Sequence, residues 1–430
     1  MAVFNRDDEG AGGSRALIVV PDIAGSAQSR SNEARIEEAV GLAAAIGIEV
    51  SATMTFRVRQ VRPATLLGGG QVDEVAQTAD AEDVELVIVD AGLTPVQQKT
   101  LEERTGRKVI DRTGLILEIF GERAATAEGR LQVELAHLDY QAGRLVRSWT
   151  HLERQRGGFG FLGGPGETQI EADRRMIRDR MAKIRRELEQ VKKTRALHRD
   201  RRQRAPWPVV ALVGYTNAGK STLFNRLAGA GVMAEDLLFA TLDPTMRQIR
   251  IPGHDKVILS DTVGFVSDLP TQLVAAFRAT LEEVESADLI LHVRDIAHED
   301  SEAQREDVGD VLAELGLDAE NGPPQLEVWN KIDLLHGDER RAVLGEAARR
   351  DDVAVVSAIS GEGVDELKAA IGDWLAPETN VHEIDLDAGD GARLSWLHQR
   401  GKVMEQVVDG DRLRLKVELS PDNWARYQAL

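Results

Sequence analysis

The chain has 430 residues, of which 42% are apolar and 29% charged, and its formal net charge is −19. This composition predicts a soluble globular protein of roughly two to four domains, and the negative charge argues against a general nucleic-acid-binding protein or a DNA partner. The absence of cysteine excludes disulfides and thiol catalysis, and no run approaches the roughly 18 apolar residues of a membrane span, so we expect a cytoplasmic protein.

The first 14 residues are predicted to be disordered, and residues 15–122 to form a small α/β domain, because strand and helix patterns alternate along them. The clearest elements are the strand Ala16–Val20, a helix from Asn32 to Ile46 capped by Ser31 or Asn32, the strand Glu85–Asp90, and a helix opened by Thr94 and Pro95. The glycine-rich turn Gly68–Val72 has no Lys-Ser or Lys-Thr after it, and we interpret it as structural.

Residues 123–204 are predicted to form an antiparallel helical hairpin, because two stripes of apolar residues repeat at alternating spacings of four and three. The stripes are Leu131, Leu135, Leu138, Ala142, Leu145, Trp149 and Leu152, followed by Ile177, Met181, Ile184, Leu188 and Val191. Val133 and Val146 lie outside the first stripe. Two ordinary amphipathic helices packed on a domain are the alternative.

The hairpin tip, residues 154–167, combines six glycines with two arginines and two phenylalanines. Glycine permits close backbone approach, and exposed aromatic and arginine side chains suit stacking on unpaired bases. Residues 174–204 add 14 Lys or Arg against four Asp or Glu, a local charge of +10 that leaves −29 for the rest of the chain. A solvated helix face is the alternative, but such focused charge favours RNA contact. The RNA-contact candidates are Arg154, Arg156, Gly157, Gly158, Phe159, Gly160, Phe161, Arg174, Arg175 and Arg178.

Residues 206–380 are predicted to form a Ras-like P-loop GTPase domain, beginning with the motif G-x-x-x-x-G-K-S. An apolar strand pattern precedes the motif and a helix pattern follows it. Backbone N–H groups of such a loop bind phosphate, while Lys220 reaches the β- and γ-phosphates and Ser221 ligates Mg²⁺. The residues expected to bind nucleotide here are Gly214, Tyr215, Thr216, Asn217, Ala218, Gly219, Lys220, Ser221 and Thr222.

Three later motifs identify the nucleotide as GTP. A D-x-x-G motif ends an apolar strand, so that Asp261 can hold Mg²⁺ and Gly264 can offer its N–H to the γ-phosphate. An N-K-x-D motif supplies the Asp333 carboxylate, which would accept two N–H donors from guanine but would be left unpaired by adenine. The motif residues, including those that close the base pocket, are Asp261, Thr262, Val263, Gly264, Asn330, Lys331, Ile332, Asp333, Ser357, Ala358 and Ile359.

A switch threonine is expected between these motifs, to complete the Mg²⁺ shell when GTP is bound. The switch segment expected to touch nucleotide is Phe239, Ala240, Thr241, Leu242 and Asp243. Thr241 is favoured over Thr245, because Pro244 stiffens the chain just before the latter. The catalytic candidates are therefore Lys220, Thr241 and Gly264, and the metal ligands Ser221, Thr241 and Asp261.

Intrinsic hydrolysis is expected to be slow. Phe265 follows Gly264, where many GTPases carry a glutamine that orients water, so stimulation should come from a partner or a cation. Asn217 is a candidate for holding K⁺, with the alternative that it merely suits the turn.

At the far end, a helical pattern runs from Val364 to Leu375, and residues 381–430 are predicted to form a small β-rich domain with strands at Arg393–Leu397 and Arg412–Glu418.

Over about residues 15–380 the chain resembles the HflX family of ribosome-associated GTPases. The motifs that carry the resemblance are Asp111–Phe120, Glu128–Ala136, Gly164–Glu171, Gly214–Thr222 and Phe239–Thr245. The resemblance implies binding to the large ribosomal subunit and nucleotide-dependent splitting or rescue of stalled or idle ribosomes under stress. It also implies that the tip reaches rRNA near the peptidyl-transferase centre. We expect a cytoplasmic monomer that associates peripherally with ribosomes or membrane.

The chain departs from the family pattern on surfaces that would contact rRNA. Gln71 stands where a Lys is usual, Ala142 and Gly143 where Leu-Pro is frequent, and Leu162 and Gly163 where an Arg commonly precedes Gly-Pro-Gly-Glu. Two other functions stay open. A ribosome-assembly or RNA-processing GTPase would prefer precursor particles, and a signalling GTPase whose hairpin docks protein would bind its partner independently of salt.

Overall fold

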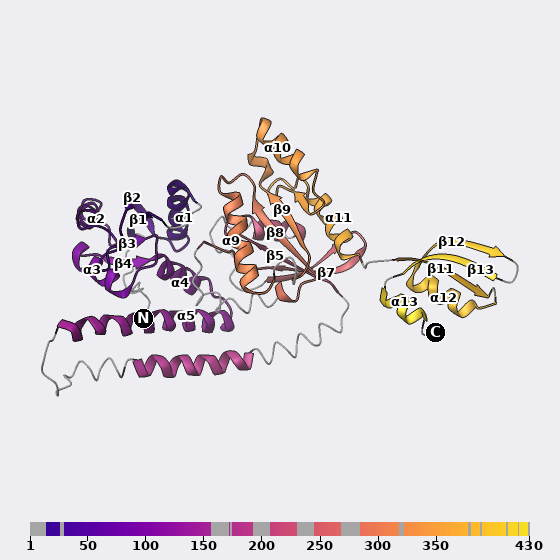
Figure 1. The fold of residues 1–430 in the computed structure, drawn as a ribbon, viewed down its shortest axis with the longest axis horizontal. Helices are drawn as coiled ribbons and strands as arrows, with labels where there is room; N and C mark the ends of the chain where they lie inside the picture. The colour runs from indigo at the N-terminus through magenta and orange to yellow at the C-terminus, as the bar shows by residue number, and fades with distance from the viewer. Residues whose placement is uncertain are drawn as a thin grey trace. The chain divides into compact units, whose positions relative to one another are not determined.

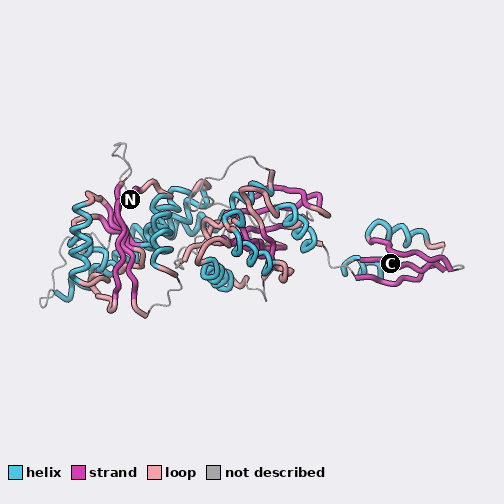
Figure 2. The backbone as a smooth tube through the Cα atoms, turned by 90° about the horizontal axis from the view of Figure 1, so that it is seen from above, coloured by secondary structure: helices cyan, strands magenta, loops and turns pink. Residues whose placement is uncertain are grey.

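The computed structural model describes residues 14–25, 30–155, 172, 174–191, 207–229, 245–267, 284–317, 322–376, 380–387, 389–409, 412–419 and 421–428. The chain divides into two compact units, residues 1–370 and 371–430. The first unit holds two sheets and the second holds one, each accompanied by helices (Figure 2). No helix in the described part of the chain is both long enough and apolar enough to cross a membrane.

The N-terminal sheet is four-stranded and entirely parallel, in the order β2-β1-β3-β4. Its strands are β1 (Arg15–Ile23), β2 (Glu49–Val58), β3 (Leu86–Val89) and β4 (Lys108–Asp111). The helices of this domain are α1 (Asn32–Ala44), α2 (Gly69–Ala81), α3 (Pro95–Thr105) and α4 (Arg112–Arg123). Alternate β1 residues enter two different apolar cores, one on each face of the sheet, which explains the continuous apolar run that predicted this strand.

The caps of these helices follow from local chemistry. The Ser31 hydroxyl accepts a hydrogen bond from Ala34 N at 3.1 Å, which confirms the predicted start of α1. Thr94 and Gln97 form a capping box at the start of α3, with Pro95 in the first turn as predicted. The Gly68–Val72 segment was predicted as a turn, and this was wrong: Gly68 is the N-cap of α2, and the helix begins at the next residue.

Helix α5 (Ala127–Gln155) and a second helix over residues 174–191 lie side by side (Figure 1). Arg180 and Glu134 pair across them through two N–H to oxygen contacts of 2.6 Å, and Met181 and Ile184 are buried as the predicted stripe requires. Val133, which the prediction placed outside the stripe, is buried with Ala136 in a core that α4 also lines. The first hairpin helix therefore has two apolar faces, one more than its heptad pattern indicated.

Helix α5 is also tied to the N-terminal sheet by polar contacts. The Asp111 carboxylate accepts hydrogen bonds from the Tyr140 hydroxyl at 2.5 Å and from the Arg144 guanidinium at 2.8 Å. The same carboxylate caps α4 through Gly114 N at 2.8 Å and accepts from Leu93 N at 3.0 Å. One buried side chain at the end of β4 thus fixes α4, α5 and the loop after β3 together.

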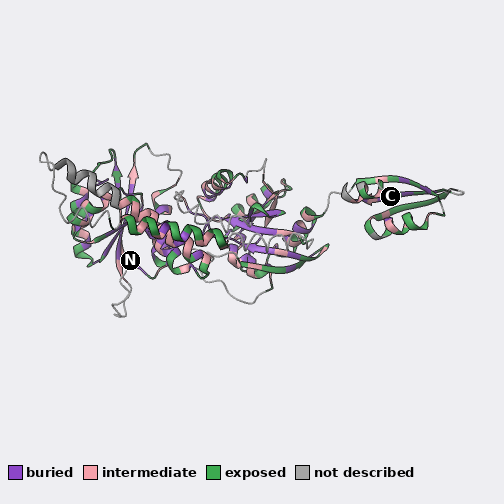
Figure 3. Ribbon diagram, turned by 90° about the horizontal axis from the view of Figure 1, so that it is seen from below, coloured by how far each residue is buried: buried purple, intermediate pink, exposed green. Residues whose placement is uncertain are grey.

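The second sheet is six-stranded, in the order β10-β9-β8-β5-β7-β6, and parallel except for the β6–β7 pair. Its strands are β5 (Val209–Gly214), β6 (Thr245–Ile251), β7 (His254–Asp261), β8 (Leu289–Asp295), β9 (Gln325–Asn330) and β10 (Val353–Val355). The accompanying helices are α7 (Lys220–Leu227), α9 (Ser301–Glu314), the 3-10 turn η1 (Ile332–Leu334), α10 (Gly337–Ala347) and α11 (Val364–Leu375). All seven β8 residues are buried, and Figure 3 shows buried residues along the inner strands. This confirms the predicted α/β fold with a P-loop GTPase domain.

The C-terminal unit contains an antiparallel sheet in the order β11-β13-β12. Its elements are β11 (Asn380–Asp387), α12 (Gly391–Arg400), β12 (Lys402–Asp409), β13 (Arg412–Leu419) and α13 (Pro421–Gln428). The prediction of a strand at Arg393–Leu397 was wrong, because these residues lie within α12. Asp390 caps that helix by accepting from Arg393 N at 3.1 Å, and Leu397 is fully buried among the sheet residues. The strand predicted at Arg412–Glu418 is confirmed as β13.

Candidate nucleotide-binding site

The phosphate-loop motif joins β5 to α7, in the strand-loop-helix order that phosphate binding requires. Gly219 has a φ of +90°, and a Cβ atom there would lie 2.2 Å from Asn330 Nδ2. Gly214 has a φ of +151°, and a Cβ would lie 2.1 Å from the carbonyl oxygen of Val293. Both ends of the loop therefore need glycine for space as well as for conformation. Asn217 is exposed and has a φ of +59°, a region that asparagine tolerates.

Lys220 is the first residue of α7, and its side chain is buried under the loop. Its ammonium donates to the carbonyl oxygens of Gly214 at 3.0 Å and Tyr215 at 2.7 Å. Burial lowers the pKa of Lys220 to about 8, and the neighbouring Asp261 carboxylate offsets this only partly. A polyphosphate beside this ammonium would add negative charge and stabilise its charged form.

Two oxygen-bearing side chains meet beside the loop. Asp261 is buried at the carboxyl end of β7, and its Oδ2 accepts a hydrogen bond from the Ser221 hydroxyl at 2.8 Å. A hydroxyl and a carboxylate at this separation form part of the hard oxygen donor set that Mg²⁺ takes, with phosphate and water as further ligands. The donors present therefore fit Mg²⁺ rather than a softer metal.

The D-x-x-G segment lies directly against the phosphate loop. Phe265 N donates to the Gly214 carbonyl at 3.1 Å, and Thr216 N donates to the Phe265 carbonyl at 2.6 Å. A Cβ on Gly264 would lie 3.0 Å from Lys220 Nζ and 2.9 Å from Thr216 Cα, so only glycine fits there. The Thr262 hydroxyl donates to the Leu212 carbonyl at 2.6 Å, while Val263 and Phe265 are buried.

The N-K-x-D motif begins at Asn330, the last residue of β9, and its side chains have different partners. The Asn330 amide donates to the Ala218 carbonyl at 2.8 Å and accepts from Ala358 N at 2.9 Å, so it links the phosphate loop to the segment after β10. Lys331 has a φ of +65°, and its ammonium pairs with Asp295 at 2.8 Å. Asp333 has a buried carboxylate oxygen, Oδ1, without a hydrogen-bond partner among the described residues. A buried carboxylate oxygen in that state is free to accept a hydrogen bond from a bound molecule.

The described contacts thus bring together the phosphate loop, the D-x-x-G motif, the N-K-x-D motif and the Ser357–Ile359 segment. Ser357 and Ala358 are buried, whereas Ile359 is 70% exposed. The predicted switch residues Phe239–Asp243, including Thr241, lie outside the described residues. The rejected candidate Thr245 begins β6, in register with Asp261.

Only some of the predicted RNA-contact residues lie in the described part of the chain. Arg154 belongs to α5, and Arg174, Arg175 and Arg178 belong to the helix over residues 174–191. Residues 156–161 of the tip lie outside the described part.

Sequence reasoning missed two contributors to the site. Asp295 ends β8 and holds the Lys331 ammonium, and Arg226 of α7 donates to the Ala358 carbonyl at 3.0 Å. A signal existed for Asp295, because it is a carboxylate at the carboxyl end of an apolar strand, the pattern that identified Asp261. Arg226 had none, since a lone arginine on a helix surface is unremarkable in a sequence.

Gly219→Ala is expected to weaken guanine-nucleotide binding by at least about tenfold, because the new Cβ collides with Asn330 and the backbone enters a strained region. The matched control is Gly229→Ala, since Gly229 has a φ of +66° but nothing within 4 Å of the added atom. Titration with a fluorescent GDP analogue should show weakened binding for the first variant alone. Equal affinity in both variants would contradict the assigned contact between the loop and Asn330.

Comparison with known proteins covers most of the chain. Four family models match: "GTP-binding GTPase N-terminal" over residues 33–121, "GTP-binding GTPase Middle Region" over 123–202, "50S ribosome-binding GTPase" over 209–331 and "HflX C-terminal domain" over 342–426. A GTPase HflX of Magnetococcus marinus is 50% identical over 393 residues, 91% of this chain and 90% of the relative. Those of Escherichia coli and Caldanaerobacter subterraneus are each 43% identical over 392 residues, 91% of this chain and 91% and 89% of the relatives.

Proposed function

Because the chain belongs to the HflX family of GTPases, we propose that its GTP-bound form binds the large ribosomal subunit and splits or rescues stalled or idle ribosomes. The observation that carries the proposal is that one chain combines a basic hairpin helix with a phosphate loop that contacts both a D-x-x-G motif and an N-K-x-D motif. The match to a family described as 50S ribosome-binding GTPases supports the choice of partner. The protein would act in the cytoplasm, as a monomer.

Within this proposal each motif takes one role at the nucleotide. Lys220 contacts the β- and γ-phosphates, and the Gly264 N–H contacts the γ-phosphate. Ser221, Asp261 and Thr241 would hold Mg²⁺, which would supply positive charge beside the phosphates. Asp333 accepts the N–H groups of guanine, for which its buried Oδ1 is available.

The helix over residues 174–191 supports the RNA contact. Its apolar side chains Met181 and Ile184 are buried, whereas Arg175, Arg178, Arg185 and Arg186 are exposed. The positive charge is therefore directed to solvent and is available to phosphate groups. Arg180 is an exception, since it pairs with Glu134 of α5.

The proposed cycle has two states. With GTP bound, Thr241 and Gly264 would contact the γ-phosphate and its metal ion, and the N-terminal domain and hairpin would take the arrangement that binds the subunit. Hydrolysis and loss of phosphate release the switches and lower that affinity. Because Phe265 cannot orient water, the intrinsic rate would be slow and the ribosomal subunit would supply the stimulation.

The test is GTP hydrolysis by the full chain, alone and with large ribosomal subunits, at low and high potassium. We expect the subunits to raise the rate strongly, and deletion of residues 157–164 to remove that stimulation. The deletion should leave the dissociation constant for GDP unchanged, since it removes none of the residues predicted to bind nucleotide.

Stimulation that survives the deletion would refute the role of the tip. Stimulation by potassium alone would identify a cation-dependent switch at Asn217, and no stimulation by either would refute the ribosomal partner. Binding to the subunits should also weaken steeply with salt, because contacts to phosphates release counterions. A salt-independent interaction would instead indicate a protein partner.

A further inference from the structure

A buried polar cluster joins the phosphate loop and the segment after Gly264 to the N-terminal domain. Its members, hereafter the Tyr215 cluster, are Arg30, Glu38, Arg112, Tyr215 and Ser267. None of the five side chains is needed to explain nucleotide contact. Tyr215 occupies a variable position of the phosphate-loop motif, and Ser267 lies three residues beyond Gly264.

The Tyr215 hydroxyl makes three hydrogen bonds. It donates to Glu38 Oε1, and it accepts from Arg30 at 2.7 Å and from the backbone N of Ser267 at 2.7 Å. Arg30 also lies over the tyrosine ring, at 4.6 Å from its centroid, and pairs with Asp307 of α9 at 2.6 Å. One side chain of the phosphate loop is thereby bonded to the segment after Gly264 and to α1.

Arg112 binds the same segment through a second set of hydrogen bonds. Its Nη2 donates to the Ser267 hydroxyl at 2.7 Å and to Glu38 Oε2 at 2.8 Å, and it reaches the Ser267 carbonyl at 3.3 Å. Its Nη1 donates to Asp90 at 2.6 Å, and Asp90 is in turn held by Arg35 at 2.9 Å. Arg112 is thus anchored at the carboxyl end of the N-terminal sheet while it binds Ser267.

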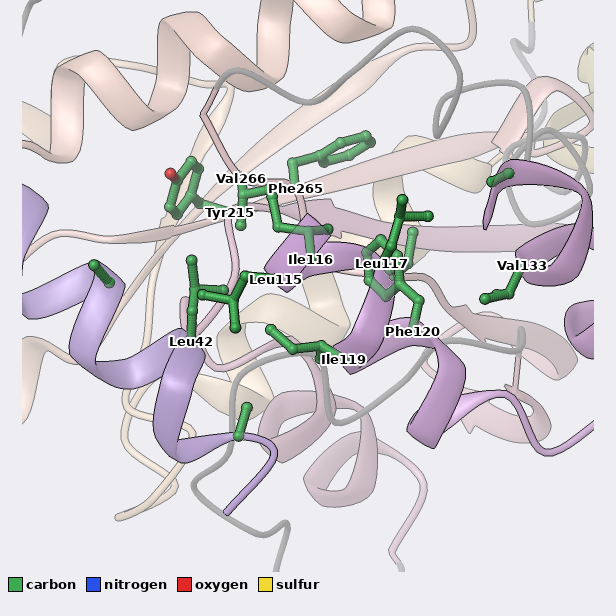
Figure 4. Close-up of a cluster of buried hydrophobic side chains, with 14 of the residues drawn as sticks. Leu42, Leu115, Ile116, Leu117, Ile119, Phe120, Val133, Tyr215, Phe265 and Val266 are labelled. Carbon is green, nitrogen blue, oxygen red and sulfur yellow. The ribbon is translucent and has the colours of Figure 1, made fainter. Parts of the chain in front are cut away.

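Apolar contacts enclose this cluster. Figure 4 shows Tyr215, Phe265 and Val266 beside Leu115 and Ile116 of α4, and all five belong to one buried core. Burial and the neighbouring Glu38 carboxylate raise the pKa of the Tyr215 hydroxyl. Burial disfavours the charged form of Glu38, but Arg112 and Arg30 outweigh it, so the pKa of Glu38 is lowered. At neutral pH the hydroxyl therefore keeps its proton and the carboxylate its charge.

A short backbone path is held at one end by the pairing of β7 and at the other by the Tyr215 cluster. Gly264 and Phe265 lie between Asp261 and Ser267, and Phe265 is bonded through its own backbone to Gly214 and Thr216. The Gly264 N–H, which must reach the γ-phosphate, is thus held between one bonded strand end and the Tyr215 cluster. Because only two residues separate Ser267 from Gly264, the position of Ser267 restricts the backbone at Gly264.

We propose that Tyr215 and Arg112 are positioning residues for GTP hydrolysis: through Glu38 and Ser267 they hold the segment after Gly264 against the phosphate loop. The N-terminal domain thereby sets the rate of the hydrolytic step rather than the affinity for nucleotide. This inference concerns the GTPase reaction alone and is independent of the ribosomal partner. Neither residue touches the reacting atoms, so loss of either should lower kcat without removing the site.

The test compares three variants of the full chain. Tyr215→Phe keeps the ring and deletes the hydroxyl, and we expect it to lower kcat about tenfold while KM and the dissociation constant for GDP stay within about threefold. Arg112→Lys should act in the same direction, because lysine keeps the charge but cannot bind Asp90, Glu38 and Ser267 together. The matched control is Tyr140→Phe, which removes a hydroxyl that is bonded to the Asp111 carboxylate and, within the described part of the chain, makes no hydrogen bond to the segment after Gly264.

Single-turnover hydrolysis, GDP titration and thermal melting separate the outcomes. A selective fall of kcat in Tyr215→Phe and Arg112→Lys, with Tyr140→Phe unchanged, would support positioning. The proposal is overturned if Tyr215→Phe leaves kcat within about twofold, or weakens GDP binding as much as it lowers kcat. An equal fall of kcat in Tyr140→Phe would also overturn it, since the effect would then be general loss of stability.

Discussion

Lys220→Ala is expected to reduce GTP hydrolysis by at least about 10²–10³-fold and to weaken GTP binding severely, because one preorganised charge is removed from the phosphates. The ammonium is buried under the loop and donates to two carbonyl oxygens, and alanine removes both these hydrogen bonds and the positive charge. Steady-state hydrolysis and titration with a non-hydrolysable GTP analogue measure the two effects. The loss should be larger for GTP than for GDP, because the lysine reaches the γ-phosphate as well as the β-phosphate.

Lys256→Ala is the matched control for this change. Lys256 is an exposed lysine of the same sheet, on β7, and its ammonium lies 4.4 Å from the centroid of the Trp207 ring. Its loss should leave both measurements unchanged. If Lys220→Ala kept near-normal GTP affinity, the phosphate-loop assignment of this site would be wrong.

Asp333→Asn is expected to lower GTP affinity on the order of 10³-fold. Guanine would donate two hydrogen bonds to the carboxylate, whereas the asparagine amide can accept only one and places its own N–H group against the second N–H group of guanine. Xanthine carries an oxygen where guanine carries its amino group, and an asparagine amide can donate to that oxygen. The variant should therefore gain affinity for xanthosine triphosphate as it loses affinity for GTP. Competition of both nucleotides against a fluorescent analogue measures the exchange.

Asp338→Asn provides the control for base recognition. Asp338 lies in the first turn of α10, five residues beyond Asp333, and is exposed to solvent beside Arg341. Its substitution should not alter nucleotide preference. Retained preference for GTP in Asp333→Asn would show that Asp333 does not recognise the base.

The nucleotide site could be predicted from the sequence because its parts lie at strand ends. Asp261 and Asn330 each follow a short apolar run, and the parallel arrangement of such runs brings their ends to one edge of the sheet. The start of α1 and the start of the helix at Pro95 could be predicted for a similar reason. A helix cap depends on residues within about four positions of the helix start. These predictions needed no knowledge of the packing.

The wrong or missing predictions arose where a local sequence pattern fitted both strand and helix, or where contacts with residues distant in the sequence determined the structure. Arg393–Leu397 is too short an apolar run to separate strand from helix, and the Asp390 cap settles it as helix. Val133 was assigned to no apolar face, because a heptad pattern marks only the residues that contact one partner helix. The Tyr215 cluster was invisible for another reason: Glu38 and Tyr215 are 177 positions apart, and each is unexceptional in its own segment.

The anchoring of α5 at Asp111 makes the hairpin helix a lever arm. Tyr140 and Arg144 fix the helix to the end of β4, and the helix continues to Gln155. Those last 11 positions extend about 16 Å at the usual rise, so a rotation of roughly 10° at the anchor would move the far end by about 3 Å. A rotation too small to disturb the packing of the core would therefore move the far end of α5 by about the length of a hydrogen bond.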